Sequence, residues 1–212
     1  IEDACQSILA SINNRIAGSW GEFGAFSLHP LKNINVWSDG GIITTNNKNY
    51  YKKLLLLRNH GLIDRDKSLM WGTNSRLDNL QAGFGNIMLK KIPSWNKKQL
   101  NIAKRYSKYL SKKLKKPIYN LEISNPTFHQ YIVRTKLRDK LRIFLSKNKI
   151  DTAIHYPIPI HKQKAFKNQF GDIKLPLTEK FSREILSLPI NPHMKDSEVN
   201  YVIKKVNEFF KK

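Results

Sequence analysis

The chain has 212 residues, enough for one large domain or two small ones with a buried core. Its apolar fraction of 40% and aromatic fraction of 10% are typical of a globular protein and exclude an intrinsically disordered chain. No apolar run reaches the roughly 20 residues that a membrane-spanning helix needs. The single cysteine, Cys5, excludes an internal disulfide framework and a cysteine-based zinc site. We therefore expect a cytoplasmic protein with no membrane segment and no bound metal.

The charge is strongly positive, with 38 Lys and Arg against 16 Asp and Glu and a formal net charge of +22. A surface of this kind can bind a polyanion such as nucleic acid or an anionic membrane. The basic residues are spread along the whole chain, however, without the regular aromatic interleaving of single-strand binders. We therefore interpret the charge as a solvated, lysine-rich surface. A non-catalytic polyanion-binding protein, or an inactive remnant of an enzyme, remains the alternative.

The first half of the chain alternates short apolar runs with helical patterns. Its opening, Ile-Glu-Asp, is typical of the end of a buried strand, so we expect a fragment that begins inside a domain. Periodicity and turn residues predict strands at 23–28 and 42–45 and helices at 4–13, 47–58, 77–89 and, after Pro93, 94–115. The polar loop between the second and third of these helices is too long for a simple connector and is a candidate functional loop.

The second half begins after Pro117. Its pattern predicts strands at 128–134 and 152–156 and helices at 138–148, 178–187 and 196–210. The last helix has Asp196 as its expected N-cap. It carries an apolar stripe made of Val199, Val202, Ile203, Val206, Phe209 and Phe210. The alternation predicts an α/β protein with one domain at 1–95 and a second at 96–212, the boundary lying near 93–117.

One lysine differs from the many others in its setting. Residues 23–41 contain a short strand that ends at Ser27, and Lys32 follows five positions later in a turn rather than on a charged helix. Four apolar residues of the flanking strands predict that the base of this turn is buried in apolar packing: Phe26, Leu28, Ile42 and Ile43. Burial or a neighbouring cation lowers the pKa of a lysine amine and makes it a nucleophile. Lys32 is therefore the candidate catalytic residue, and the Ser27 hydroxyl can bind a phosphate oxygen.

A carboxylate near the start of the chain completes this group. Asp3 stands at the C-terminal end of the first strand, where α/β folds present their ligand-binding groups. Pyridoxal phosphate needs such a carboxylate to keep its ring nitrogen protonated, which makes the ring an electron sink. Asp3, Ser27 and Lys32 together indicate a pyridoxal phosphate site more strongly than any one of them alone.

The sequence resembles the sugar aminotransferases of the DegT/DnrJ/EryC1/StrS family, which have the type I pyridoxal-phosphate fold. The matching blocks are Ile-Glu-Asp-Ala-Cys-Gln at 1–6, Phe-Ser-Leu-His-Pro-Leu-Lys-Asn at 26–33 with Asp-Gly-Gly at 39–41, Arg-Asn-His-Gly at 58–61, Gly-Thr-Asn-Ser-Arg-Leu-Asp-Asn-Leu-Gln-Ala at 72–82, and His-Tyr-Pro-Ile-Pro-Ile-His at 155–161. The resemblance as a whole covers nearly all 212 residues, and the blocks stand in the family's order. The resemblance implies an α/β fold, namely the C-terminal part of the large cofactor domain, a mixed sheet flanked by helices, and a small α+β C-terminal domain.

The resemblance also implies roles for the cofactor residues. Lys32 would form the Schiff base with pyridoxal 5'-phosphate and shuttle the proton. Asp3 would pair with the ring nitrogen, Gln6 would lie near the ring hydroxyl, and Ser27 would bind the cofactor phosphate. Asn74 would reach the phosphate of the neighbouring subunit's cofactor, so a homodimer with shared active sites is implied.

The substrates follow from the same resemblance. The blocks are most similar to members that act on the 3-keto position of nucleotide-linked deoxysugars, with glutamate as the expected amino donor and cell-surface polysaccharide as the expected destination. His155 and Tyr156 are candidates for contacts to the sugar nucleotide. For His161 and Arg76 a substrate contact and a structural hydrogen bond are equally open. Some relatives are dehydratases with histidine in place of the lysine, and Lys32 argues against that branch.

Two departures from the family pattern bear on activity. Leu28 and His29 replace the aromatic-rich residues that are common between the serine and the lysine. The N-terminal part of the family, which carries the helix N-terminus that cradles the phosphate and the aromatic residue that stacks on the ring, lies outside this sequence. We therefore expect the fragment alone to be inactive.

Overall fold

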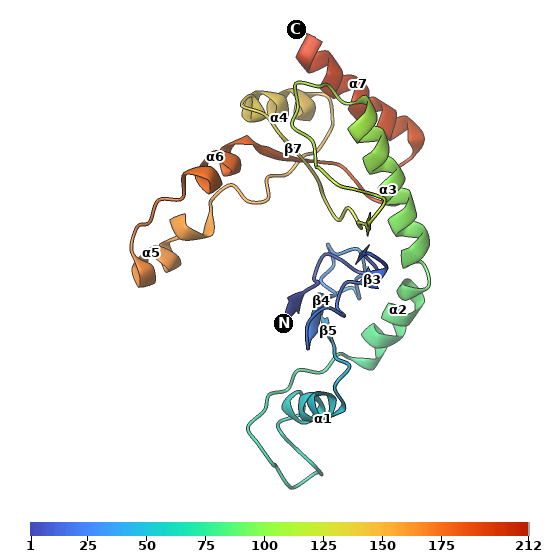
Figure 1. Cartoon of the computed structure of the whole chain (residues 1–212), viewed down its shortest axis with the longest axis vertical. Helices are drawn as coiled ribbons and strands as arrows, with labels where there is room; N and C mark the ends of the chain where they lie inside the picture. The colour runs from blue at the N-terminus through green and yellow to red at the C-terminus, as the bar shows by residue number, and fades with distance from the viewer. Residues whose placement is uncertain (212) are drawn as a thin grey trace. The chain divides into compact units, whose positions relative to one another are not determined.

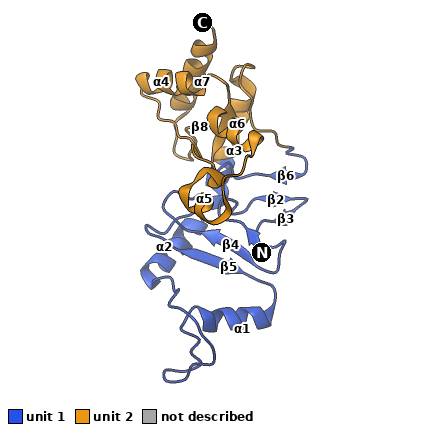
Figure 2. Cartoon of the chain, turned by 90° about the vertical axis from the view of Figure 1, so that its left-hand side faces the viewer, with its two compact units in different colours: residues 1–97, 120–129 blue, residues 98–119, 130–212 orange. Residues whose placement is uncertain are grey.

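The computed structural model describes residues 1–211 (Figure 1), and the chain divides into two compact units (Figure 2). The first unit consists of Ile1–Lys97 and Asn120–His129, and the second consists of Lys98–Tyr119 and Gln130–Lys212. Helix α3 (Ile92–Tyr109) contributes its start to the first unit and the rest to the second. The first unit is thus discontinuous in sequence.

The first unit contains a mixed three-stranded sheet. Its strands are β1 (Glu2–Asp3), β4 (Gly24–Ser27) and β5 (Gly41–Thr44), with β4 in the centre. Strand β1 runs parallel to β4 and pairs Asp3 with Ala25, whereas β5 runs antiparallel and pairs Gly41 with Ser27. The predicted strands at 23–28 and 42–45 are therefore present, and the mixed sheet expected from the resemblance is confirmed.

The helix predicted at 4–13 is wrong. The structure has a hairpin there, in which β2 (Ser11–Ile12) pairs with β3 (Arg15–Ile16), and β2 also pairs with β6 (Ser124–Asn125). The two turn residues, Asn13 and Asn14, have φ angles of +48° and +61°. Positive φ at both central residues is the pattern of a type I′ hairpin turn, and asparagine tolerates it better than most residues. The Asn-Asn pair is thus the local signal for a hairpin.

The helices of the first unit follow the predicted pattern with shifted ends. Helix α1 (Lys48–Leu57) begins after Asn47, whose side chain accepts from the N–H groups of Asn49 at 2.9 Å and Tyr50 at 3.2 Å. Helix α2 (Asn79–Leu89) ends just before α3. Pro93 is the second residue of α3, a position where the missing N–H costs no hydrogen bond, so the helix starts before the proline and ends at Tyr109.

The core of the first unit lies under the lysine turn. Leu28, Ile34, Val36 and Ile92 are at most 2% exposed and form one cluster. The half-buried side chains packed against this cluster are Ile8, Leu77, Met88 and Trp95. The turn from β4 to β5 is therefore anchored by its own apolar residues and by the first turn of α3.

The second unit has a two-stranded antiparallel sheet covered by helices. Its strands are β7 (Tyr131–Arg134) and β8 (Ile185–Leu188), and Tyr131 pairs with Leu188. The other elements are α4 (Arg138–Lys147), the 3-10 helix η1 (Ile160–Lys162), α5 (Lys164–Phe170), α6 (Pro176–Glu184) and α7 (Asp196–Lys211). Strand β8 replaces the end of the helix predicted at 178–187. The strand predicted at 152–156 is reduced to a single bridge between Ala153 and Ser187.

Helix α7 confirms the predicted apolar stripe in its main part. Val199, Val202, Val206 and Phe210 are buried, and helices α4 and α7 pack against each other. Asp196 is the first residue of α7 rather than its N-cap, and its carboxylate pairs with Arg105 of α3. Among the helices of the described residues, none combines the length and the apolar character needed to cross a membrane.

Candidate functional site

Lys32 lies in a tight turn at the C-terminal end of β4. Its N–H donates to the carbonyl oxygen of His29 at 2.9 Å, and the N–H of Leu31 donates to Nδ1 of His29 at 3.1 Å. The turn is closed at its base, where the N–H of Leu28 donates to Gly40 O at 2.8 Å. Lys32 itself is half-buried. The backbone that carries the amine is therefore fixed over an apolar core.

The apolar residues that pack at the base of the lysine turn are not all those that the sequence predicts. Leu28 is 1% exposed as expected, but Ile42 and Ile43 of β5 are 37% and 56% exposed. The buried partners of Leu28 are instead Ile34 and Val36, which belong to the lysine turn itself. The apolar support comes from the turn folding back on β4 rather than from β5.

Asp3 and Ser27 end two parallel neighbouring strands, so both lie at the same edge of the sheet. The N–H of Cys5 donates to Asp3 Oδ1 at 3.1 Å. The Cys5 thiol and N–H beside this carboxylate, with a smaller contribution from the charge of Lys32, hold the pKa of Asp3 below its ordinary value. The Asp3 carboxylate is therefore an anion at neutral pH, within electrostatic reach of the Lys32 amine.

Ser27 and Gln6 lie on the segments that flank this pair. The half-buried Ser27 accepts from the N–H of His29 at 3.3 Å, so its hydroxyl hydrogen can point to an acceptor such as a phosphate oxygen. The Gln6 side chain is exposed, while its backbone oxygen accepts from the buried Thr127 hydroxyl at 2.8 Å. The structure thus brings the segments of four predicted cofactor residues to one sheet edge.

The donor set fits pyridoxal phosphate group by group. This cofactor presents a pyridine nitrogen, an aldehyde and a phosphate. Asp3 supplies an ionised carboxylate for a protonated nitrogen, Lys32 an amine for the aldehyde, and Ser27 a hydroxyl for the phosphate. The residues present therefore match the chemistry of the group that they would hold.

Asn74 and Arg76 lie on the long loop between α1 and α2, which Figure 1 shows extending beyond α1. The Arg76 guanidinium donates to Asn74 Oδ1 at 3.2 Å and to Asn59 Oδ1 at 3.0 Å. Asn74 and Arg76 are both exposed. Arg76 thus makes structural hydrogen bonds that fix the Asn74 side chain at the loop surface.

His155 and Tyr156 lie in the second unit. His155 is half-buried, and its Nδ1 atom is 2.9 Å from the hydroxyl of Ser187 in β8. The Tyr156 side chain is 68% exposed and meets the His155 ring edge to face at 5.5 Å. A rigid histidine beside an exposed tyrosine is a suitable contact surface for a polar ring or a nucleobase.

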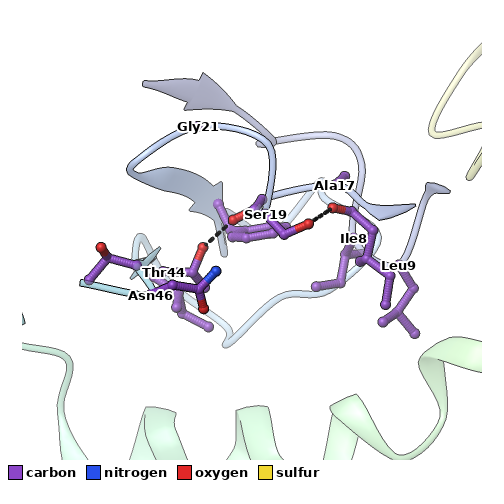
Figure 3. Close-up of a pocket in the computed structure, with 12 residues that line it drawn as sticks. Ile8, Leu9, Ala17, Ser19, Gly21, Thr44 and Asn46 are labelled. Atoms are coloured by element: carbon purple, nitrogen blue, oxygen red, sulfur yellow. Dashed lines mark hydrogen bonds between the residues drawn. The ribbon is translucent and has the colours of Figure 1, made fainter. Parts of the chain in front are cut away.

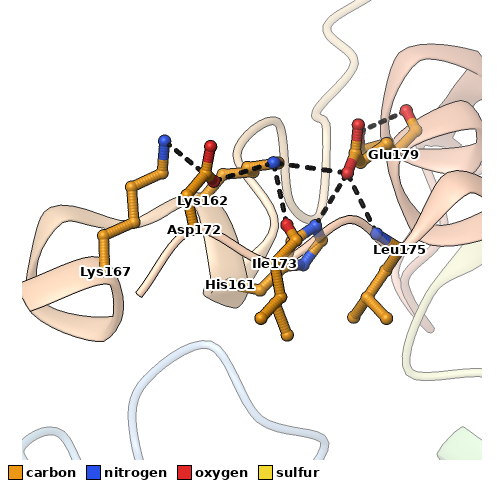
Figure 4. A network of polar contacts seen from close by, with 8 residues as sticks. His161, Lys162, Lys167, Asp172, Ile173, Leu175 and Glu179 are labelled. Carbon is orange, nitrogen blue, oxygen red and sulfur yellow. Dashed lines mark hydrogen bonds and ion pairs between the residues drawn. The ribbon is translucent and has the colours of Figure 1, made fainter. Parts of the chain in front are cut away.

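His161 has a different setting, at the centre of a polar network that Figure 4 shows. The ring is 3% exposed, and Nε2 lies 3.2 Å from Oε1 of Glu179. The same carboxylate accepts from the N–H of Leu175 at 3.1 Å and pairs with Lys162 at 3.5 Å. Lys162 in turn binds Asp172 at 3.0 Å. These contacts within the chain support the structural role that the sequence left open for His161.

The same network lowers the pKa of its acidic groups. The hydrogen bond from His161, the Leu175 N–H and the charge of Lys162 hold the pKa of Glu179 below its ordinary value. Lys162 and Lys167 have the same effect on the pKa of Asp172, which in turn raises the pKa of Lys162. The network therefore joins η1, the loop after α5 and α6 through charges that are present at neutral pH.

A separate pocket of about 310 Å³ lies in the first unit (Figure 3). It is lined by apolar and small residues of the hairpin region and of β4 and β5, including Ile8, Leu9, Ala17, Phe26 and Ile42. The predicted cofactor residues are not part of its lining. Within residues 1–211 the structure contains no group of three or more His, Cys, Asp or Glu side chains that could hold a metal ion.

Sequence patterns do not point to four residues that support these sites, namely Asn33, Asn96, His129 and Ser187. Asn33, which follows Lys32, contacts His129 and Asn96 from distant parts of the first unit. Ser187 was assigned to a helix, although it is the hydroxyl that orients His155. Asn33 directly follows Lys32 in the chain, but no local pattern connects Asn33 with His129, which lies 96 positions later.

Comparison with known proteins places these features in context. The model of the DegT/DnrJ/EryC1/StrS aminotransferase family matches residues 1–207 of the chain. A dTDP-3-amino-3,4,6-trideoxy-alpha-D-glucose transaminase of Streptomyces venezuelae is 36% identical over 99% of this chain and 56% of that protein. A dTDP-3-amino-3,6-dideoxy-alpha-D-galactopyranose transaminase of Aneurinibacillus thermoaerophilus is 37% identical over 99% of this chain and 57% of that protein. The chain thus spans about half the length of these curated relatives.

The solved structures agree with the sequence comparison. The crystal structure of S. venezuelae DesV in complex with a ketimine intermediate superposes with a TM-score of 0.92 at 35% identity. The match covers 97% of this chain and 56% of that one. The α/β fold expected from the resemblance is therefore confirmed.

Proposed function

Because this chain belongs to the DegT/DnrJ/EryC1/StrS aminotransferase family, we propose that its full-length protein transfers an amino group to a nucleotide-linked keto-deoxysugar with pyridoxal phosphate as cofactor. The observation that carries the proposal is that an ionised Asp3 lies within electrostatic reach of Lys32 at the edge of the β1–β4 pair. The relatives are about twice as long as this chain, so the full protein would supply the remainder of the site.

Each residue of the sheet edge has a distinct task in this proposal. Bound pyridoxal phosphate supplies an electron-withdrawing ring that carries an amino group from one substrate to another. The carboxylate of Asp3 stays ionised and would therefore stabilise a positive charge on the ring nitrogen. Ser27 donates to the phosphate and Gln6 contacts the ring hydroxyl. Lys32 would hold the aldehyde end of the cofactor, and its Nζ atom would take up or release the proton.

We assign substrate recognition to the second unit. His155 and Tyr156 contact the sugar nucleotide, with the ring of His155 held by Ser187. The two relatives named above are 3-amino-deoxysugar transaminases, which points to a 3-keto position on a deoxysugar, and glutamate is the proposed amino donor. His161 stabilises the segment that follows these two residues through its contact with Glu179. In this assignment residues 1–95 bind the cofactor, and 96–212 form the connecting helix and the small domain.

A homodimer is part of the proposal. Helix α2 exposes Leu80 and Ile87 at 90% and 56%, and Trp37, which stacks on Phe84 at 3.9 Å, is 77% exposed. Apolar side chains on one helix and its neighbouring turn are typical of a subunit interface. Asn74, on the exposed loop before α2, would then reach the phosphate of the partner's cofactor. We propose a cytoplasmic location.

One observation favours the alternative function. The second unit holds 26 of the 38 Lys and Arg of the chain but only 8 of the 16 Asp and Glu. Several of these acidic groups are already paired with basic ones, for example Asp139 with Arg138 and Glu208 with Lys205. A polyanion would therefore be attracted to this unit. Salt-sensitive binding of labelled DNA by a full-length protein that takes up no pyridoxal phosphate would favour this alternative.

The proposed function is tested with the full-length protein and pyridoxal phosphate. We expect visible absorbance of the bound cofactor that glutamate bleaches and that a nucleotide-linked keto sugar restores. Lys32→Ala should abolish the response, whereas Lys53→Ala, which changes an exposed lysine of α1, should leave it intact. A bleaching response that survives Lys32→Ala would refute the assignment of Lys32.

A further inference from the structure

A chain of hydrogen bonds joins the residue after Lys32 to two distant segments of the first unit. Oδ1 of Asn33 lies 2.9 Å from Nδ1 of His129, and Nδ2 of Asn33 donates to Oδ1 of Asn96 at 3.4 Å. Asn96, which is 8% exposed, donates from Nδ2 to the carbonyl oxygen of Ile8 at 2.9 Å. We call Asn33, Asn96 and His129 the Asn33 clasp.

The direction of every bond in the clasp follows from its last acceptor. The carbonyl oxygen of Ile8 can only accept, so Asn96 donates through its amide nitrogen and presents Oδ1 to Asn33. Asn33 must then donate its own amide hydrogen and present Oδ1 to His129. Because an amide oxygen cannot donate, Nδ1 of His129 carries the proton. The clasp therefore requires a hydrogen-bond donor at this place, not merely a side chain of similar size.

The clasp holds the backbone next to the reactive amine. Asn33 directly follows Lys32, whose own N–H donates to the carbonyl oxygen of His29 at 2.9 Å. The backbone of Lys32 is thus restrained on both sides, by the turn before it and by the clasp after it. Since the lysine side chain is long and flexible, the position of its backbone decides which region Nζ can reach.

The other ends of the clasp hold the segment that contains Asp3 and Gln6. Asn96 binds the backbone of Ile8, two residues beyond Gln6. Thr127, which is 6% exposed and precedes His129 by two residues, donates to the Gln6 carbonyl oxygen at 2.8 Å. The segment with the carboxylate and the turn with the amine are therefore fixed to the same two supports.

We propose that the Asn33 clasp positions the Lys32 amine, with Asn33, Asn96 and His129 as positioning residues. The proposal rests on the proposed function, in which Lys32 is the reacting amine. A small misplacement of a reacting group costs rate without removing the group itself. Loss of the clasp should therefore slow the reaction of Lys32 with an aldehyde while the amine and the fold remain.

The test compares two variants of the full-length protein without bound cofactor. His129→Leu removes the donor, whereas His129→Asn offers an amide N–H close to the place of Nδ1. Pyridoxal phosphate and cyanoborohydride label the lysines, and mass spectrometry of peptides gives the rate at Lys32 relative to the exposed Lys53. We expect this relative rate to fall about tenfold in His129→Leu and to recover to within about threefold of wild type in His129→Asn.

Steady-state kinetics give a second readout. In His129→Leu kcat should fall in the same order as the labelling rate, while KM for glutamate stays within about twofold, because the substrate contacts are unchanged. Equal relative rates in wild type and His129→Leu would overturn the proposal. An equal loss in His129→Leu and His129→Asn would also overturn it, since side-chain volume rather than the donor would then matter.

A further pair of variants covers the case in which His129→Leu loses its native circular dichroism. Asn33→Ala should lower the relative labelling rate of Lys32, and Asn101→Ala, at an exposed position of α3, should not. The absence of any difference between these two would overturn the proposal. If the wild-type protein does not transaminate, the proposed function fails, but the labelling comparison still decides whether the clasp positions Lys32.

Discussion

Nδ1 of His155 lies 2.9 Å from Oγ of Ser187, a residue of β8 that is 7% exposed. The backbone of Ser187 also bonds Ala153 in both directions, at 2.8 and 3.2 Å. One residue of the sheet thus fixes both the backbone that leads to His155 and the orientation of its ring. The opposite edge of the imidazole is thereby set for whatever the segment binds.

Ser187→Ala removes the hydroxyl while keeping the backbone bridge. We expect KM for the nucleotide sugar to rise about fivefold with kcat nearly unchanged, since one neutral hydrogen bond contributes about 1 kcal/mol. Steady-state kinetics of the full-length protein measure both constants. The matched control is Ser182→Ala, another buried serine, whose hydroxyl donates to Glu179 O at 2.9 Å. An unchanged KM in Ser187→Ala, or an equal rise in the control, contradicts the role of Ser187.

Two glycines of the first unit should respond to alanine in opposite ways. Gly61 has a φ of +71°, and a Cβ there would lie 1.7 Å from the carbonyl oxygen of Met70. Gly61→Ala should therefore destabilise the protein by more than about 1 kcal/mol, because the backbone itself must move. Gly83, inside α2, has nothing within 4 Å of its Cβ position, so Gly83→Ala should stabilise by about 0.5–1 kcal/mol. Thermal unfolding of both variants distinguishes these signs.

The polar network around His161 makes stability depend on pH. The pKa of Glu179 lies below its ordinary value, and the largest cause is the hydrogen bond from His161. A carboxylate with a depressed pKa stabilises the fold above its unfolded pKa, and this stabilisation is lost as pH falls through the folded value. Urea midpoints should therefore fall below about pH 4.3 less steeply in Glu179→Gln than in wild type. Parallel pH profiles for the two proteins would contradict this prediction.

Two residues of α4 test the core of the second unit. Leu145 is fully buried, and Leu145→Ala should cost about 2–5 kcal/mol through lost contacts and the cavity that remains. Ile143, two positions earlier, is 57% exposed, and Ile143→Ala should change the free energy of unfolding by no more than about 0.5 kcal/mol. Urea unfolding measures both. Similar losses for the two variants would show that α4 does not pack as described.

Elements whose residues form one long periodic pattern could be predicted from the sequence. Helix α7 is such a case, since its buried stripe repeats from Val199 to Phe210. Strand β8 could not be predicted, because its four residues read as the continuation of α6. Its pairing partner, β7, lies more than fifty positions earlier in the chain. The contacts that make these residues a strand are with residues distant in sequence, and local sequence patterns do not reveal such contacts.

In the candidate site, too, local patterns point to some residues, whereas others depend on contacts between distant segments. Asp3, Ser27 and Lys32 can be proposed from the sequence because each stands at the end of a short strand or in the turn that follows it. The Asn33 clasp was not recognisable, since Asn33 and His129 are 96 positions apart. The hairpin at Asn13 and Asn14 was missed for a different reason. Its signal is local, but the apolar residues before it fit a helix equally well.

The pairing of β6 with β2 has a consequence for the order of folding during synthesis. Strand β6 and Thr127 belong to the first unit, although they follow all of α3 in the chain. A ribosome therefore completes α3 before it releases the last strand that the first unit needs. Until Asn125 emerges, β2 has only β3 beside it, and its other edge remains unpaired.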